Sequence, residues 1–545
     1  MSQKSPGAFA GRHWPVIGAV AVFWLAMAVL LALSMRMTGG RLIYPLDDAY
    51  IHMAMAKNSI LHGVWGITRY GFSSSSSSPL WTLLLLGTYA LFGVNEVSPF
   101  VLNLLFGTVA VVVAYSVIAK HVTGRLVVFA VCLLILFLTP LPSLAFTGME
   151  HVLQAILTLC FVWLSARALS STARLPPGKV ALLALLAALV TAVRYEGVFL
   201  AAVVCVLFAL NRRRLTAGVV AAAALLPVVA YGIWSVSAGW YFLPNSVLLK
   251  GSVPSLHARG IAEILFGYRA WATAGKSPHL LLLLIVASFL LVFRLVKRAP
   301  RTTSTYALAA FVGVTLLHLS FAQAGWFYRY DAYLVFIGVT TVAAAVGDLG
   351  PGAFAWRIRR ERLPRYAAAA LLVALIAGPL GIRAARSLYF IPQAAKNTYE
   401  QQYQMGLFLR RYYQGIPVAV NDIGAASFLA DTKLLDLAGL GSMEPARLKL
   451  ANRYGDDQAY SLANREGTKV AIVYYDWFSS RRWTEVGRWR ISGNVACGGD
   501  LVSICAVDTS ATEGLVRNLQ EFARDLPAGV EQLGVYTAGV RNRDK

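Results

Sequence analysis

Charged residues are scarce in this sequence, and acidic residues are scarcer than basic ones. Asp, Glu, Lys and Arg together make up 14% of the chain, whereas soluble domains carry about 25%. Hydrophobic residues make up 57%, and long apolar runs recur along most of the sequence. This composition excludes an ordinary soluble protein and is typical of a membrane protein with several spanning helices.

Cysteine is also rare, with five residues in a chain of 545. None of them forms a Cys-x-x-Cys arrangement or a His/Cys cluster, so the sequence contains no common zinc-site pattern. Cys497 and Cys505 lie in a polar C-terminal region on either side of a Gly-Gly pair. If that region is extracytoplasmic, the two residues are compatible with a disulfide.

The basic excess gives the chain a formal net charge of +23. A charge of this size can indicate binding to nucleic acid. Much of it, however, lies in short loops between apolar segments, at residues 211–214, 297–301 and 357–362. This location is typical of the cytoplasmic loops of a membrane protein. We therefore expect a lipid bilayer as a partner and no nucleic acid.

Twelve apolar segments are candidates for membrane helices, at residues 15–35, 79–93, 98–119, 126–143, 152–166, 179–193, 197–210, 216–236, 279–296, 305–322, 331–347 and 366–382. The first is too long for a signal peptide and lacks a cleavage site, so we expect a retained helix. The basic loops place the N-terminus in the cytoplasm and the region after residue 383 outside a bacterial cytoplasmic membrane. Ends on opposite sides require an odd number of spans. We therefore expect about eleven transmembrane helices, with one segment between residues 79 and 119 re-entrant or half-spanning.

The predicted organisation is an all-α polytopic membrane domain over residues 1–383 and a small α/β extracytoplasmic domain over residues 384–545. The first outer loop of the membrane domain covers residues 36–78. Composition becomes typical of a soluble domain after residue 383. The hydrophobic pattern there predicts strands at 416–420, 470–475 and 501–507, and helices at 393–413 and 511–524.

Two adjacent carboxylates, Asp47 and Asp48, follow the first apolar segment. A paired carboxylate near lipid can serve as a general base or bind a divalent cation. The alternative is an N-cap for a following helix. Residues 48–60 are compatible with a short amphipathic helix lying along the membrane surface.

Six consecutive serines, Ser73 to Ser78, precede Pro79 in the same loop. Such a run is compatible with a flexible linker. It is equally compatible with hydroxyl groups that bind anionic oxygens at a helix entrance, because proline fits the first turn of a helix.

Further ionisable residues lie in or beside the apolar segments. Glu150, Arg194 and Glu196 are functional-site candidates because charges at such depth are costly, and the alternative is a salt bridge that holds helices together. Lys250 and Arg329 lie in predicted outer loops among aromatic residues. They are candidates for binding a phosphate, or interfacial anchors. All these groups share the predicted outer side, which fits a lipid-phosphate-linked donor.

These residues carry a resemblance to a known family. The chain resembles the GT-C superfamily of polyprenyl-phosphate-sugar-dependent membrane glycosyltransferases, and within it the group of mycobacterial terminal arabinofuranosyltransferases. The similar segments cover most of the chain in the same order, namely residues 46–51, 76–81, 148–150, 194–197, 243–250, 421–425 and 436–440.

The resemblance implies an inverting transfer of a sugar from a polyprenyl-phosphate donor to a glycan, lipid or protein acceptor. Asp47 would be the general base, with Asp48 as second candidate. No cofactor is required, although a divalent cation at Asp47 and Asp48 is compatible with the sequence. Residues expected to bind the donor phosphate are Lys250, Arg194 and Arg329, and those expected to contact substrate are His52, Tyr50, Glu150, Glu196, Ser77, Ser78 and Asn245.

A transporter or flippase of a lipid-linked glycan is the alternative function. In such a protein the same charges would line a path rather than a reaction site. Many transporters are built from repeated halves, and this sequence shows no internal repeat. The large outer domain also favours the enzyme.

Overall fold

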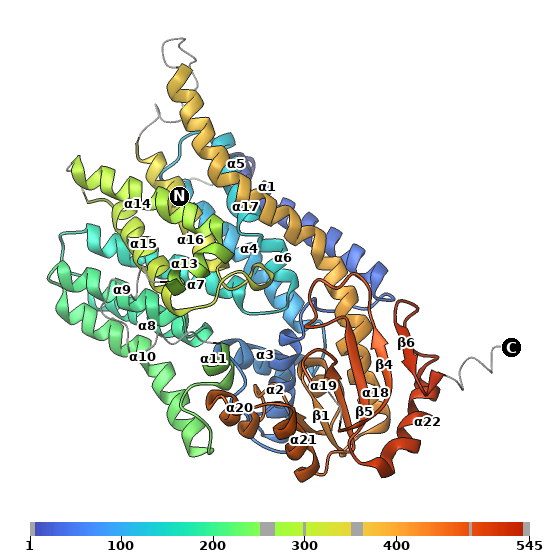
Figure 1. Ribbon diagram of the computed structural model, residues 1–545. Helices are drawn as coiled ribbons and strands as arrows, with labels where there is room; N and C mark the ends of the chain where they lie inside the picture. The colour runs from blue at the N-terminus through green and yellow to red at the C-terminus, as the bar shows by residue number, and fades with distance from the viewer. Residues whose placement is uncertain (1–5, 251–267, 298–300, 350–362, 479–481, 538–545) are drawn as a thin grey trace.

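The structure is a computed structural model that describes residues 6–250, 268–297, 301–349, 363–478 and 482–537. A helical part and a smaller part with a β-sheet lie side by side (Figure 1). Helix α17 (Leu363–Thr398) connects them and runs along the helical part as one long helix. The predicted domain boundary at residue 384 falls within this helix.

In the described residues, the helical part contains eleven apolar helices, the long helix α17 and several short ones. Their bounds are α1 Pro6–Met37, α2 Asp48–His62, α3 Pro79–Phe92, α4 Ser98–Ile118, α5 Arg125–Leu138, α6 Leu141–Phe146, α7 His151–Ser170, α8 Pro177–Val193, α9 Gly197–Leu210, α10 Arg214–Ser237, α11 Asn245–Lys250, α13 Tyr268–Lys276, α14 Pro278–Val296, α15 Thr303–Phe321, the 3-10 helix η1 Trp326–Tyr328, α16 Ala332–Gly347 and α17.

Each of the twelve predicted apolar segments overlaps a helix. Among the described residues, six helices are long and apolar enough to cross a membrane, and five more are apolar but shorter. The protein is therefore a multi-pass membrane protein. Helix α3 has 14 residues and is about 21 Å long, less than the ~30 Å hydrocarbon core. One segment between residues 79 and 119 was predicted to be re-entrant or half-spanning, and of the two helices there α3 is shorter than α4. The basic loops at 297–301 and 357–362 lie largely outside the described residues.

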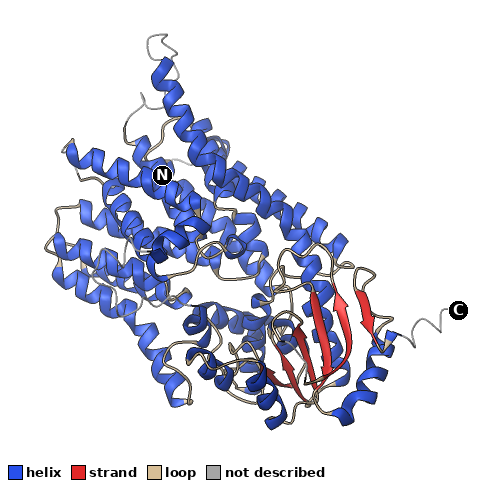
Figure 2. Cartoon of the chain, viewed as in Figure 1, coloured by secondary structure: helices blue, strands red, loops and turns tan. Residues whose placement is uncertain are grey.

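The C-terminal part is an α/β domain around one mixed sheet of six strands (Figure 2). The strand order is β2-β1-β3-β5-β4-β6. Strand β1 pairs in parallel with both β2 and β3, whereas β5, β4 and β6 pair in antiparallel fashion. Its elements are η4 Tyr399–Tyr403, α18 Gln404–Tyr412, β1 Pro417–Val420, α19 Gly424–Leu429, β2 Lys433–Asp436, α20 Met443–Leu450, α21 Asp456–Arg465, β3 Val470–Tyr474, β4 Thr484–Arg490, β5 Leu501–Ala506, η5 Thr509–Ala511, α22 Thr512–Phe522 and β6 Glu531–Gly534.

The sheet is apolar on both faces because helices cover both. Residues of α18, α19 and α22 share a core with Val418, Ile472 and Ile504 on one face. Helix α21 packs on the other face, against Ala419 and Ala471. Strands buried on both faces read as continuous apolar runs. The three strands predicted from such runs are confirmed as β1, β3 and β5.

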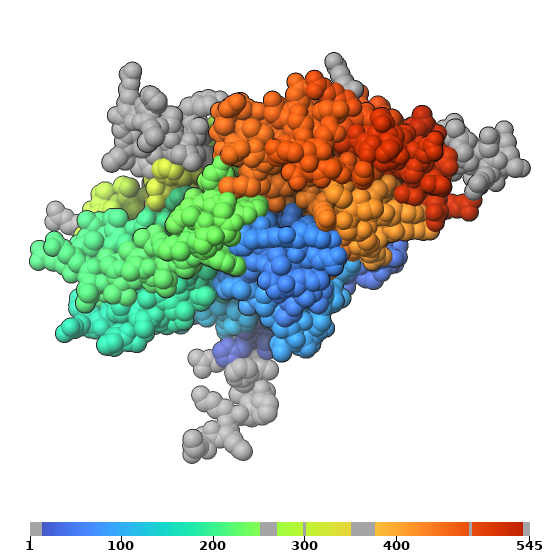
Figure 3. Space-filling view, turned by 90° about the horizontal axis from the view of Figure 1, so that it is seen from below, coloured from blue at the N-terminus to red at the C-terminus, as the bar shows by residue number. Residues whose placement is uncertain are grey.

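Helix α2 lies between the two parts of the molecule. Ile51 and Met55 on α2 belong to the core of the C-terminal domain, whereas Tyr50 and Met53 belong to the core of the helical part. Figure 3 shows the C-terminal domain, in orange and red, against the blue N-terminal residues. Protein covers α2 over residues 49–56, whereas Ile60 and Leu61 at its end are exposed. Its predicted position along a membrane surface stays a prediction.

Two predictions are corrected by the packing. Five of the six serines at 73–78 are buried, and Ser73 Oγ accepts a hydrogen bond from the Ile67 amide at 2.9 Å. The run is a packed segment and not a flexible linker. The disulfide is not formed: the Cys497 thiol instead donates to Gln402 Oε1 at 3.2 Å.

Candidate active site

Asp47 connects the helical part to the C-terminal domain. Its Oδ2 accepts a hydrogen bond from the Gly424 amide at 2.6 Å, and its Oδ1 accepts one from the Ala425 amide at 2.8 Å. A Cβ at position 424 would lie 2.0 Å from the Asp47 carbonyl oxygen, so only glycine permits this approach. The Asp47 side chain makes no capping bond to α2, and its partners are on α19.

Asp48 faces two cationic side chains. Its Oδ1 is 3.0 Å from Lys250 Nζ, and its Oδ2 is 3.0 Å from Arg329 Nη2. Burial alone would raise the pKa of Asp48, but the Arg329 and Lys250 charges outweigh it and hold the pKa below its usual range. Asp48 is therefore a permanent anion that fixes the two cations side by side.

The pKa of Asp47 is shifted in the opposite direction. Burial between the two domains and the negative charge of Asp422 raise the pKa of Asp47 above the usual carboxyl range, although the Gly424 and Ala425 amides act against the shift. Asp422 Oδ2 accepts hydrogen bonds from Gln402 Nε2 at 2.8 Å and from the Tyr474 hydroxyl. Two adjacent carboxylates thus have environments that push their pKa values apart, which is the arrangement expected for different chemical roles.

A cavity of about 1350 Å³ lies between the helical part and the C-terminal domain, and Asp47 and Asp48 both line it. A cavity between domains is the common place for a ligand site. The acidic and basic side chains in its lining are Asp47, Asp48, Lys250, Lys276, Arg329, Asp422 and Lys449.

Arg329 and Lys250 are each held in place by neighbouring elements. Arg329 is 1% exposed; its Nη1 lies 2.9 Å from Met149 Sδ, and its guanidinium lies 4.9 Å from the centre of the Tyr330 ring. Lys250 ends α11, whose first residue Asn245 donates through Nδ2 to the Gly439 carbonyl at 2.9 Å. Asn245 therefore anchors the lysine-bearing helix to the C-terminal domain.

Glu150, Arg194 and Glu196 form an ion cluster that does not line the cavity, with Glu150 and Arg194 buried and Glu196 half-buried. Arg194 Nη1 is 2.7 Å from Glu150 Oε1, and its Nη2 and Nε bind Glu196 at 2.7 and 3.1 Å. Gly148, at φ +70°, lets the chain pass the Tyr44 ring before Glu150, where a Cβ would lie 2.5 Å away. The two carboxylates balance the Arg194 charge, as in the salt-bridge alternative.

The remaining predicted contacts also lie outside the cavity lining. His52 is hydrogen-bonded to Thr82 and Ser76 at 3.1 and 3.2 Å, and its Nε2 is 3.6 Å from Glu150 Oε2. Tyr50 is buried among the rings of Tyr44, Tyr403 and Phe428. Ser78 caps α3 by accepting from the Trp81 amide, and Ser77 beside it is partly buried.

Asp422, Asn421, Gln402 and Trp477 line the cavity and were not among the residues predicted from the sequence. A polar Asn-Asp pair directly after a buried strand was the available signal for two of them. In the part of the chain that the structure describes, no group of three or more His, Cys, Asp or Glu side chains is arranged to hold a metal ion.

Part of this chain matches a described family, and the chain is similar to several solved structures. No curated protein matches the sequence. Residues 392–505 match a family described as "Domain of unknown function (DUF8728)". The crystal structures of ArnT from Cupriavidus metallidurans, bound to undecaprenyl phosphate and in the apo state, are each similar at a TM-score of 0.52 with 14% identity, over 90% and 91% of this chain and 98% of ArnT. The cryo-EM structure of arabinofuranosyltransferase AftD from Mycobacteria matches with 16% identity and a TM-score of 0.40, over 90% of this chain and 40% of AftD.

The likeness to ArnT extends over nearly the whole of both chains. It shows that the protein has a GT-C-like fold. The predicted fold class, a polytopic helical domain followed by a small α/β domain, is confirmed.

Proposed function

We propose that the protein is an integral membrane glycosyltransferase. It moves a sugar, with inversion, from a polyprenyl-phosphate donor to an acceptor at the outer face of a bacterial cytoplasmic membrane. The observation that carries the proposal is the cavity between the domains, where Asp47 and Asp48 lie beside Lys250 and Arg329 in a GT-C-like fold. The ArnT structure similar to this chain is bound to undecaprenyl phosphate, which supports a donor of the same class.

Lys250 and Arg329 bind the donor phosphate in this mechanism. Both already bind one carboxylate at 3.0 Å, so their charged groups are spaced to share an anion. Arg329 offers a planar fork of donors and Lys250 a point charge. Asp48 positions the pair. As the bond between the sugar and the phosphate breaks, these cations stabilise the charge that develops on the departing polyprenyl phosphate.

Asp47 acts as the general base. Its carboxylate removes the proton of an acceptor hydroxyl, whose oxygen attacks the anomeric carbon from the side opposite the phosphate. A raised pKa, caused by burial and Asp422, brings the base closer to the working pH. A phosphate is already a competent leaving group, so we expect transfer to continue after treatment with a chelator.

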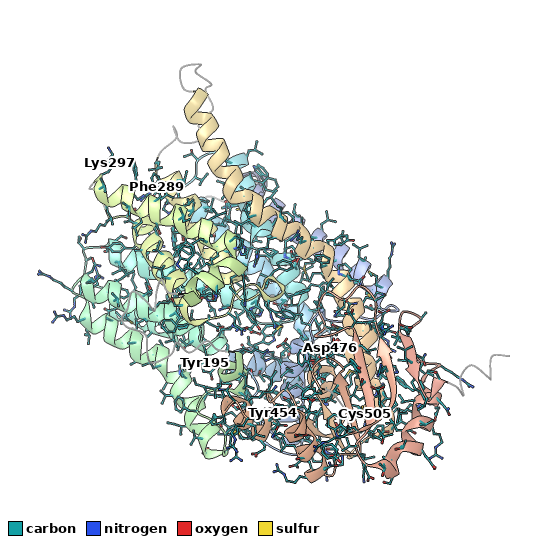
Figure 4. All side chains as sticks on the ribbon, viewed as in Figure 1. Tyr195, Phe289, Lys297, Tyr454, Asp476 and Cys505 are labelled. Carbon is teal, nitrogen blue, oxygen red and sulfur yellow. The ribbon has the colours of Figure 1, made fainter. Side chains whose placement is uncertain are left out.

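The orientation of the molecule supports an extracytoplasmic site. Figure 4 places Lys297 at the end of the helical part that is remote from the C-terminal domain. Lys297 begins one of the basic loops, and basic loops lie on the cytoplasmic side. The cavity is on the side of the C-terminal domain and therefore outside.

The test is transfer by purified protein in proteoliposomes supplied with labelled polyprenyl-phosphate sugars and envelope acceptors. We expect label in the acceptor with release of polyprenyl phosphate, and at least a tenfold loss in Lys250→Met, the cost of a charge-assisted contact. Lys469→Met is the matched control, because Lys469 pairs with Asp508 on the surface.

The alternative predicts a different result. A transporter or flippase would move the lipid-linked sugar between leaflets without releasing polyprenyl phosphate. That outcome would replace the proposed activity.

A further inference from the structure

The C-terminal domain presents the carboxyl ends of its three parallel strands to the cavity. Strands β2, β1 and β3 run in the same direction. In open α/β sheets, ligands bind in the crevice outside these strand ends. The residues that follow the three strands and line the cavity are Asn421, Asp422, Ile423, Ala438, Leu440 and Trp477.

Asn421 and Asp422 present one hydrogen-bond donor and one acceptor at this edge. Asn421 is 4% exposed, and its Oδ1 accepts from the Tyr474 amide at 2.7 Å. Its Nδ2 has no hydrogen-bond partner among the described residues. The neighbouring Asp422 carboxylate is fixed through Oδ2 by Gln402 and Tyr474. A buried amide group without a partner is costly, and a ligand oxygen would satisfy it.

Two tryptophans line the same cavity from opposite parts of the molecule. Trp477 follows β3 and is 50% exposed, whereas Trp326 lies in η1 of the helical part and is 48% exposed. The Trp477 ring rests on Tyr474, with ring centres 5.0 Å apart. Aromatic faces carry partial negative charge, and the C–H groups of a sugar ring are their natural counterpart.

We infer that this edge of the sheet is the acceptor subsite and that it binds a neutral, polyhydroxylated glycan. The inference rests on the proposed function and names its acceptor class. Trp477 stacks on a sugar ring, Asn421 Nδ2 donates to one hydroxyl, and Asp422 accepts from another. The adjacent Asp47 then receives the proton of the hydroxyl that attacks the donor.

The charge distribution distinguishes this acceptor from an anionic one. Lys250 and Arg329, which face Asp48, come from the helical part, whereas Asp422 follows β1 and the Asp47 carboxylate is hydrogen-bonded to the start of α19. The cation on the C-terminal side of the lining, Lys449, donates to the Ala438 carbonyl at 2.7 Å. A phosphorylated acceptor placed there would meet two carboxylates, and like charges in a desolvated site repel strongly. Neutral hydroxyl groups both donate and accept, so they match the Asn-Asp pair.

The subsite can be tested by ligand binding to the full-length protein in nanodiscs, without donor. The probes are the neutral oligosaccharides released from the envelope polysaccharides of the source organism, the phosphorylated fraction of the same envelope, and a peptide mixture. Saturation-transfer NMR reports contact with sugar C–H protons, and titration gives the dissociation constant. Variants Trp477→Ala and Asp422→Asn are compared with matched controls Tyr475→Ala and Asp476→Asn, whose parent residues are exposed neighbours outside the cavity lining.

We expect the neutral oligosaccharides to bind, with at least tenfold weaker binding in the two cavity variants and unchanged binding in the controls. Preferential binding of the phosphorylated or peptide probes, absence of glycan binding, or glycan binding insensitive to both variants would overturn the inference. Glycan binding at Trp477 without any sugar transfer would refute the proposed function and leave the subsite standing. Sugar transfer to a glycan whose KM is unchanged in Trp477→Ala would refute the subsite and leave the proposed function standing.

Discussion

Asp48 and Arg329 are 281 positions apart in the sequence, yet Asp48 Oδ2 and Arg329 Nη2 are 3.0 Å apart. This contact joins the first residue of α2 to the segment before α16 in the lining of the cavity. Lys250 completes the arrangement from α11. Three distant segments therefore build one charged site, and each can be tested separately.

Replacing Arg329 by lysine tests whether the planar fork matters. Arg329→Lys keeps the charge but loses the fork, in which Nη2 contacts Asp48 and Tyr330 while Nη1 contacts Met149. We expect binding of polyprenyl phosphate to weaken about tenfold, because a point charge does not replace bidentate recognition. Arg411→Lys is the control, since Arg411 pairs with exposed carboxylates. If both variants bind polyprenyl phosphate with equal affinity, Arg329 does not bind the donor phosphate.

Gly424 tests the contact between the two domains. A Cβ in Gly424→Ala would clash with the Asp47 carbonyl oxygen at 2.0 Å. We expect strong loss of activity and a destabilisation of about 1–3 kcal/mol, the usual cost of overpacking. Gly514→Ala on α22 is the control, because nothing lies within 4 Å of its added Cβ. Thermal unfolding in detergent measures both, and equal melting temperatures would contradict the close approach.

The ion cluster around Arg194 has a structural role in our interpretation. Arg194→Met leaves Glu150 and Glu196 without their shared cation. Breaking a buried pair costs about 3–5 kcal/mol, so we expect a lower melting temperature. The exposed Arg465 pairs with Glu466, and Arg465→Met should change stability by about 0–1 kcal/mol. If the Arg194→Met protein is as stable as the original and loses only donor binding, Arg194 binds the donor phosphate and its role is not structural.

The pH dependence of transfer tests the environment of Asp47. The base is active when deprotonated, so the rate should rise as the pH increases through its pKa. Because burial and Asp422 raise the pKa of Asp47, this rise should lie above the usual carboxyl range of about 3.9. Asp422→Asn removes the negative charge that helps to raise the pKa of Asp47, so the rise in transfer rate should move to lower pH. Asp476→Asn should leave it in place, and an identical profile in all three proteins would contradict the coupling.

Much of the architecture could be predicted from the sequence, because membrane helices and doubly covered strands both give continuous apolar runs. All twelve apolar segments and strands β1, β3 and β5 were found in this way. Strand β4 was missed because Thr484–Arg490 is a polar segment without such a run. Strands β2 and β6 are as short as β1, but their sequences, Lys-Leu-Leu-Asp and Glu-Gln-Leu-Gly, contain no continuous apolar run like that of β1.

The site was predictable only in part. Ionisable residues in outer loops indicated Asp47, Asp48, Lys250 and Arg329, and all four line the cavity. The same reasoning could not separate them from Glu150 and Arg194, because a buried salt bridge and a binding site use the same residue types. The Asn421-Asp422 pair after a buried strand was a usable signal that was not followed, whereas the approach of Asp422 to Asp47 depends on docking of the C-terminal domain, which no local pattern encodes.

The most direct test of the proposed activity is single-turnover sugar transfer by Asp47→Asn in proteoliposomes with labelled polyprenyl-phosphate sugar. Asparagine keeps the shape of the side chain but cannot accept the proton. We expect donor binding within a few-fold of the original protein and a loss of about 10²–10⁴ in the rate of transfer. Transfer at the original rate in Asp47→Asn would contradict the assignment of Asp47 as the general base.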